Sequence, residues 1–190
     1  GLPRYAQFDN DTVFQGAHQW PDSFGRVTRL CLQLGVVPVF APPRETGFQA
    51  AIENYNGRWQ AKVWQRFTFT SSPDLRTQSE RFVTAARVRS AARIESAPRR
   101  QAFPKSWTLQ LNKPLAGQVV YLRRTNATGQ VDLLGHVWDV DAHWCHRLVR
   151  CEVDLTKERI RIYRLRRRTP TVQPLLTTIP YVPPKKRFHE

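Results

Sequence analysis

The stretch Arg-Tyr-Ala-Gln-Phe-Asp at residues 4–9 predicts a short strand over residues 4–8 that ends at Asp9. Residues 36–40, Val-Val-Pro-Val-Phe, predict a second, buried strand, in which Pro38 indicates either an edge position or the loss of one ladder hydrogen bond. Between them, apolar side chains at helical spacing predict a helix over residues 22–34. This order of strand, helix and strand predicts that the first part of the chain has an α/β fold.

The ends of that first helix have their own signals. Asp22 or Ser23 is expected to cap its N-terminus, and Gly35 to stop it. Residues 47–66 predict a second helix. Its expected apolar face consists of Phe48, Ile52, Tyr55, Trp59 and Val63, beside a polar stripe of Gln49, Glu53, Asn56 and Gln60.

A third helix is predicted over residues 72–94, with Ser72 as its cap and Pro73 in its first turn. It is rich in arginine, and the basic stretch 97–104 that follows predicts a linker. After residue 105, runs rich in Val, Leu, Ile and Tyr predict strands. They lie at about 118–124, 131–140, 147–155 and 159–167.

Four to five short strands of this kind predict a small β-barrel. Within 147–155, alternation places Val149, Cys151, Val153 and Leu155 on one face. The expected organisation has four segments: a catalytic-core half, a basic helix with linker, the barrel, and a basic proline-rich tail that is extended or loose. Their bounds are 1–70, 71–104, 105–170 and 171–190.

The charge is uneven along the 190 residues, which carry 30 Lys and Arg against 15 Asp and Glu, a net charge of +15. Residues 1–60 are neutral, residues 61–105 carry +7 and residues 106–190 carry +8. Such an excess predicts a nucleic-acid partner. No run approaches the 18 or so apolar residues of a membrane-spanning helix, so no membrane partner is expected. Three scattered cysteines form no disulfide framework and favour a cytoplasmic location.

Asp9 at a strand end and Glu53 on a later helix are candidates for a divalent-metal site. Two-metal sites need several carboxylates that converge from different elements, and Mg²⁺ prefers oxygen ligands. The spacing of the two acids does not by itself separate this interpretation from two surface carboxylates.

Residues 6–10, Ala-Gln-Phe-Asp-Asn, resemble the second catalytic aspartate motif of the retroviral-integrase superfamily, in the branch of bacterial insertion-sequence transposases. The resemblance continues through Phe-Gln-Gly at 14–16, residues 29–36, Pro-Pro-Arg-Glu at 42–45 and residues 52–60. It covers residues 1–70 closely. The later helix and β-rich region resemble more loosely the C-terminal parts of integrases and Mu-type transposases.

This resemblance implies the second half of an RNase H-like core with an Asp-Asp-Glu triad, Mg²⁺ or Mn²⁺ as cofactor, and DNA cleavage and strand transfer. By motif, Asp9 is the second acid and Glu53 the third. Glu45 lies 36 positions after Asp9, against 44 for Glu53, but Glu53 has the matching Glu-Asn-Tyr-Asn context. Asp11 and Gln49-Ala50 depart from the usual pattern.

The family's first catalytic aspartate lies upstream of the strand at 4–8, so the chain is expected to be N-terminally truncated and inactive alone. DNA is the expected partner, with a homo-oligomer on DNA and a nucleoid-associated location in a bacterium. The candidate DNA-binding residues are Asn10, Asn56, Arg58, Gln60, Arg87, Arg89, Arg93, Arg123, Arg124, Arg166, Arg167 and Arg168.

Other motifs favour structural roles. His143, Cys145 and His146 lack a second ligand pair at zinc spacing. Trp107, Trp138 and Trp144 are expected in the barrel core rather than in base stacking. Two other functions remain open: a catalytically inactive DNA-binding remnant of a mobile element, and a basic RNA-binding protein without a metal.

Overall fold

The computed structural model describes residues 1–166, 168–183, 185 and 188. The chain divides into two compact units, which are described separately. Residues 1–45 and 100–190 form one unit, called here the β unit, and residues 46–99 form the helical unit. The boundaries of these units differ from those of the four segments expected from the sequence.

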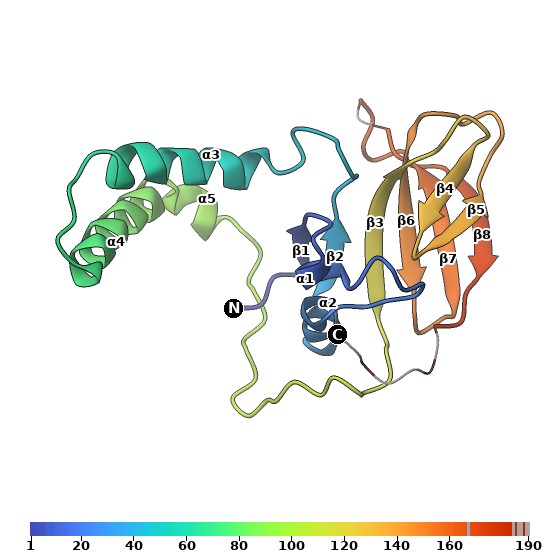
Figure 1. The fold of residues 1–190 in the computed structure, drawn as a ribbon, viewed down its shortest axis with the longest axis horizontal. Coiled ribbons are helices and arrows are strands. Elements are labelled where there is room, and N and C mark those ends of the chain that lie inside the picture. The colour runs from blue at the N-terminus through green and yellow to red at the C-terminus, as the bar shows by residue number, and fades with distance from the viewer. Residues whose placement is uncertain (167, 184, 186–187, 189–190) are drawn as a thin grey trace. The chain divides into compact units, whose positions relative to one another are not determined.

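The β unit is built on a mixed sheet with the order β1-β2-β3-β6-β7-β8 (Figure 1). Strands β1, β2 and β3 are parallel to one another, and β3, β6, β7 and β8 are antiparallel. The strands are β1 Tyr5–Phe8, β2 Val37–Phe40, β3 Gln118–Arg124, β6 Leu148–Asp154, β7 Arg159–Arg164 and β8 Leu175–Pro180. A separate hairpin consists of β4 (Gln130–Leu133) and β5 (His136–Asp139).

The predicted small barrel is wrong, because the strands of the described residues lie in an open sheet. β3 pairs with β2 on one side and with β6 on the other, so it continues the parallel part of the sheet. The pairing of Phe40 with Tyr121 stacks their rings at 5.0 Å and buries both. This apolar contact favours one continuous sheet instead of a barrel closed by the later strands alone.

One face of the sheet carries the core of the β unit. The predicted alternation in β6 is confirmed, because Val149, Cys151, Val153 and the following Leu155 are all buried. Ile160 and Ile162 of the neighbouring β7 are fully buried on the same face. Each such side chain stabilises the fold by about 1.5–3 kcal/mol through burial of apolar surface.

The C-terminal tail does not remain wholly loose, since β8 lies within it. Ile179 pairs with Ile160 of β7, and both belong to or pack against the buried core. Sequence periodicity missed this strand because several prolines dominate the local composition.

The helices of the β unit are α1 (Thr12–Gln15) and α2 (Arg26–Gln33). The predicted cap of α2 at Asp22 or Ser23 is wrong, since Gly25 occupies the N-cap. The Asp22 carboxylate instead accepts a hydrogen bond from the Tyr181 hydroxyl at 2.9 Å. Gly35 follows the C-cap with φ at 69°, as expected for a helix stop.

The helical unit contains α3 (Ala50–Trp59), a π-helical turn η1 (Gln60–Trp64), α4 (Ser72–Arg89) and α5 (Ala91–Glu95). The predicted helix over 47–66 therefore starts three residues later and ends in a π-helical turn. The helix predicted over 72–94 is interrupted at Ser90, and its cap is Ser71, whose hydroxyl accepts the N–H of Asp74 at 3.3 Å.

Few side chains form the core of the helical unit. Val63 and Phe82 are buried, and the rings of Tyr55 and Phe82 meet edge to face at 5.4 Å. The indole N–H of Trp59 donates to the hydroxyl of Ser79 at 3.1 Å, which joins α3 to α4. Ile52, predicted on the apolar face, is 52% exposed.

Candidate nucleic-acid interface

The three parallel strands end at one edge of the β unit. Because β1, β2 and β3 run in the same direction, Asp9, Ala41 and Arg124 lie at their carboxyl ends. In open α/β sheets, ligands bind at this end of the strands. The sequence therefore places its candidate carboxylate where a ligand site is expected.

Asp9 is exposed immediately after β1. Its Oδ1 accepts the backbone N–H of Asp11 at 3.2 Å, and the carboxylate of Asp11 in turn accepts the N–H of Val13 and caps α1. Two successive side-chain-to-backbone hydrogen bonds of this type hold the chain in a turn. The turn fixes the backbone at Asp9 while its side chain remains at the surface.

Asn10 and Arg123, both candidate DNA contacts, instead support the fold. Asn10 donates from Nδ2 to the carbonyl oxygen of Ala41 at 2.7 Å. Arg123 is only 7% exposed, and its guanidinium donates to the carbonyls of Ala41 and Leu122 and lies 5.0 Å from the ring centre of Tyr121. Burial lowers the pKa of Arg123. Both side chains are therefore engaged in contacts within the fold.

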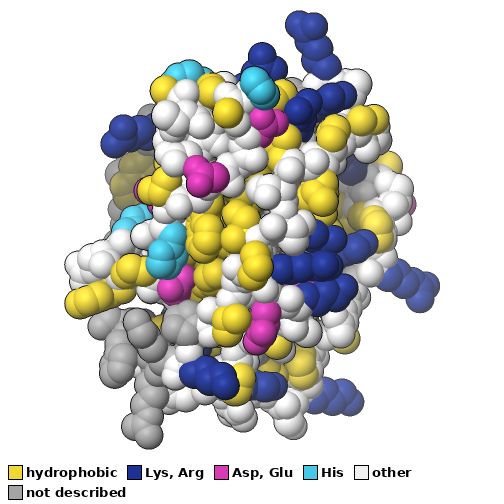
Figure 2. Space-filling view, turned by 90° about the vertical axis from the view of Figure 1, so that its right-hand side faces the viewer, with side chains coloured by type: hydrophobic (Ala, Val, Ile, Leu, Met, Phe, Trp, Pro, Cys, Tyr) yellow, Lys and Arg dark blue, Asp and Glu magenta, His cyan; other side chains and the backbone are white. Residues whose placement is uncertain are grey.

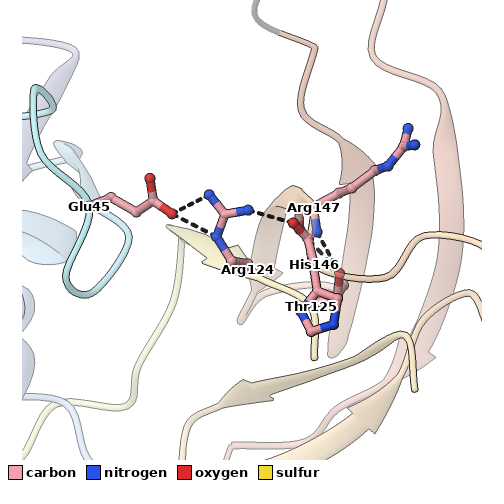
Figure 3. Close-up of polar contacts among 5 residues, drawn as sticks. All are labelled: Glu45, Arg124, Thr125, His146 and Arg147. Carbon is pink, nitrogen blue, oxygen red and sulfur yellow. Dashed lines mark hydrogen bonds and ion pairs between the residues drawn. The ribbon is translucent and has the colours of Figure 1, made fainter. Parts of the chain in front are cut away.

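Arg124 points the other way and is held by two partners (Figure 3). Its Nε donates to Oε1 of Glu45 at 2.7 Å, and its Nη2 donates to the same oxygen. Its Nη1 donates to the backbone carbonyl of His146. Arg124 remains about half exposed, so the three contacts orient the guanidinium without burying it.

Arg124 lines two hollows of the β unit. The first is a cleft of about 470 Å³, with Asn10, Trp20, Arg123 and Asp132 among its other lining residues. The second is an open groove of about 420 Å³. The groove is lined by Arg124, Trp144, His146, Arg147, Leu148, Leu165, Arg166, Arg168 and Thr169.

Thr125 anchors the loop that forms one side of this groove, called here the 144–147 loop. Its hydroxyl accepts the backbone N–H of Arg147 at 3.1 Å and donates to the carbonyl of Trp144. Its own N–H donates to the carbonyl of Arg147 at 3.0 Å. Thr125 is 1% exposed, so these hydrogen bonds are shielded from water and fix the loop against β3.

Trp144 carries two guanidinium groups. The Cζ atoms of Arg147 and Arg164 lie 4.7 and 4.8 Å from its ring centre. Cation–π contacts of this kind stabilise by about 0.5–1 kcal/mol each at exposed sites. Its indole N–H donates to the carbonyl of Leu148 at 3.2 Å, and the ring packs on the core. Trp144 thus supports the arginines of the groove, in keeping with the core role expected for it.

The arginines of the sheet differ in their ion pairs. Arg150 and Arg161 both pair with Glu152, at 3.1 and 2.9 Å, and Arg164 pairs with Asp141 at 3.4 Å. Within the described part of the chain, by contrast, no ion pair involves the three groove arginines Arg147, Arg166 and Arg168. An open groove with several uncompensated guanidinium groups attracts polyanions.

Arg147 is a groove residue that the sequence did not single out. It lies in the His-Trp-Cys-His-Arg segment, whose histidines and cysteine drew attention to zinc. Arg167, a predicted DNA contact, lies outside the described residues. Figure 2 shows a cluster of Lys and Arg side chains right of centre on the face drawn, with others scattered around it.

Glu53 belongs to the helical unit, whereas Asp9 belongs to the β unit. Glu53 is exposed in the first turn of α3, where its negative charge interacts favourably with the positive end of the helix dipole. The remaining candidates on this unit are all exposed. They are Asn56 and Arg58 on α3, Gln60 at the start of the π-helical turn, Arg87 and Arg89 on α4, and Arg93 on α5.

Among the described residues, no three His, Cys, Asp or Glu side chains are grouped closely enough to hold a metal ion. No helix in the same part of the chain is long and apolar enough to cross a membrane. The chain matches no protein-family model, and it matches none of the curated proteins with which it was compared.

Proposed function

We propose that the chain takes part in DNA cleavage and strand transfer, as the DNA-binding C-terminal part of an RNase H-like transposase or integrase of the Asp-Asp-Glu type. The arginine-lined groove at the carboxyl end of β3 carries the proposal. Asp9 follows the parallel strand β1 at this same edge of the sheet. The sequence resemblance and the net charge of +15 support the choice of DNA.

The proposed roles follow the chemistry of the side chains. Arg124, Arg147, Arg166 and Arg168 contact the phosphate backbone, where guanidinium groups bind with two parallel hydrogen bonds. Arg58 and the exposed arginines of α4 and α5 are further proposed phosphate contacts, on the helical unit. These contacts position the duplex and carry little sequence information.

Asp9 and Glu53 are the proposed catalytic carboxylates. Carboxylate oxygens suit Mg²⁺ or Mn²⁺, which would polarise the scissile phosphodiester and assist its attack by water or a 3′-hydroxyl. Both side chains are exposed at the surface of their units. A synaptic complex of this kind is expected to be an oligomer on DNA.

Duplex binding tests the groove. In fluorescence anisotropy titrations, neutralising Arg147, Arg166 and Arg168 together to Gln should reduce the salt dependence, the slope of log K against log salt, by about 3. Arg4→Gln removes one exposed charge before β1, at the opposite end of the parallel strands, and should change the slope by no more than about 1. Equal slopes for the triple variant and wild type would exclude the groove as the interface.

Competition and metal binding separate the alternatives. An RNA-binding protein should release labelled duplex DNA to a structured RNA at stoichiometric amounts, whereas the proposed function requires DNA to be retained. Mn²⁺ binding, followed by electron paramagnetic resonance, should weaken in Asp9→Asn. If DNA binds but Mn²⁺ binding does not depend on Asp9, the DNA-binding remnant without catalysis is the better description.

A further inference from the structure

We infer that the guanidinium of Arg124 is a phosphodiester-binding position of the groove, and that Glu45 occupies it in the DNA-free protein and is displaced when a nucleic-acid backbone binds. The inference rests on the proposed function and adds a specific contact to it. It assigns Glu45 as an internal competitor of the ligand.

Arg124 turns two adjacent N–H donors toward a single oxygen of Glu45, and a phosphate can use the same two donors. Arg124 presents Nε and Nη2 side by side to Oε1 of Glu45, as shown in Figure 3. The same edge of a guanidinium binds the oxygens of a phosphate with two parallel hydrogen bonds. Glu45 therefore provides the charge and the acceptor that a backbone phosphate would bring to this position.

The guanidinium is already oriented for a ligand. Its third nitrogen, Nη1, donates to the carbonyl of His146, in the 144–147 loop that Thr125 fixes to β3. When the carboxylate leaves, this contact still holds the plane of Arg124. A phosphate thus meets a donor pair whose orientation has been set before binding, which lowers the entropy lost on association.

The position is accessible from the groove and close to other cations. Arg124 lines the groove together with Arg147, Arg166 and Arg168, and its side chain is 47% exposed. A phosphate at Arg124 would therefore continue a backbone bound along these arginines. Each of them lacks an ion pair within the described residues, whereas Arg124 has Glu45.

The pair is exchangeable because its Arg124 side is open to solvent, while Glu45 is partly buried. Ion pairs at the surface contribute little stability and weaken with salt. Glu45 lies 20% exposed in the loop after β2, between Arg44 and the start of the helical unit at Thr46. Its displacement leaves the buried β2–β3 pairing in place, since that pairing depends on backbone hydrogen bonds and apolar contacts.

The test measures duplex affinity by anisotropy at constant salt. Glu45→Gln keeps the shape but removes the competing charge, and should raise affinity by about five-fold. Glu158→Gln is the matched control. Glu158 follows β6 at the end opposite to Leu148, which pairs with Arg124, roughly 20 Å away along the strand. At physiological salt this control should change affinity by less than about two-fold.

A double-variant cycle ties the effect to Arg124. In the Arg124→Gln background, Glu45→Gln should raise affinity no more than Glu158→Gln does. Should Glu45→Gln fail to fold, judged by circular dichroism, Glu45→Asp shortens the carboxylate by one methylene and should give a smaller gain in the same direction. The same gain for Glu45→Gln and Glu158→Gln, or a gain that persists without Arg124, overturns the inference.

These outcomes separate the inference from the proposed function. Salt-dependent binding by wild type, with no special effect of Glu45, overturns the inference and leaves the proposed function standing. Binding by Glu45→Gln but not by wild type supports the inference in its strongest form. Absence of binding in wild type and in every variant overturns both.

Discussion

Asn10 and Ala41 are 31 residues apart, and the side-chain amide of Asn10 donates to the carbonyl oxygen of Ala41 at 2.7 Å. The hydrogen bond joins the segment after β1 to the segment after β2, directly beside Asp9. The residue that the sequence suggested as a DNA or ligand contact therefore holds the backbone of the candidate carboxylate in place.

Asn10→Ala is expected to destabilise the β unit by about 1–2 kcal/mol, because the Ala41 carbonyl loses its side-chain donor in a partly buried place. Asp9→Ala is the matched neighbour: it removes only an exposed hydrogen bond to the N–H of Asp11, so the free energy of unfolding should fall by less, about 0.5 kcal/mol. Urea unfolding followed by circular dichroism measures both. Equal effects of the two substitutions would contradict the structural role of Asn10.

Phe82 is the larger of the two buried side chains of the helical unit. It is 8% exposed and contacts the ring of Tyr55 edge to face. Phe82→Ala should cost about 3–4 kcal/mol through the lost burial and the cavity left behind. Because the core of this unit is small, the helical signal at 222 nm should fall well below that of the wild-type chain.

Val88 supplies the control for that substitution, since it lies on the same helix and is 70% exposed. Val88→Ala should leave unfolding within about 0.5 kcal/mol of wild type and slightly favour the helix. A loss of stability at Val88 as large as that at Phe82 would show that exposure does not describe the packing of α4.

The cysteines differ in access to solvent, and this predicts their reactivity. Cys31 and Cys151 are buried, and burial raises the pKa of both thiols, that of Cys151 to about 12. Cys145 is partly exposed. At pH 8 a thiol reagent should label Cys145 first, and the other two only after denaturation. Rapid labelling of all three in the native protein would contradict the buried positions.

The same shift gives a pH dependence with a defined sign. Above pH 9 the Cys151 thiol ionises in the unfolded chain, whereas in the folded protein it stays protonated up to about pH 12. The unfolded state then binds fewer protons, so the free energy of unfolding falls as the pH rises from about 9 to 12. In Cys151→Ala the free energy of unfolding should decline less steeply between about pH 9 and 12. The same slope in the variant and wild type would contradict the raised pKa of Cys151.

The sequence predicted the individual elements better than their assembly. The strand ends at Phe8 and Phe40 were recognisable because local apolar runs and turn residues mark them. The joining of β2 to β3 was not, since it pairs Phe40 with Tyr121 over 81 residues, and no local period records such a pairing. The barrel prediction failed for this reason.

The site followed the same pattern. Arg124, Arg166 and Arg168 were predicted as DNA contacts because basic residues cluster around them in the sequence. The structure places all three in the lining of one groove. Arg123 has the same local context but points to the opposite face of β3 and is buried. The two arginines can be told apart only by the alternation of side chains along β3, and only once the buried face of that strand is known. Arg147 is held beside the groove by the hydrogen bond from its backbone N–H to the hydroxyl of Thr125. The two residues are 22 positions apart, and no sequence motif marks such a contact.

Thr125→Val should therefore affect both stability and binding. The substitution keeps the shape of the side chain but removes the hydroxyl that accepts from the N–H of Arg147 and donates to the carbonyl of Trp144. Two partly buried backbone groups lose their partner, so unfolding should become easier by about 1–2 kcal/mol. With the 144–147 loop released, Arg147 is less well positioned, and duplex affinity should fall by about three- to ten-fold. Thr125→Ser retains the hydroxyl and should preserve most of the affinity. If the valine variant binds the duplex as tightly as wild type while unfolding more easily, Thr125 stabilises the fold without positioning the groove.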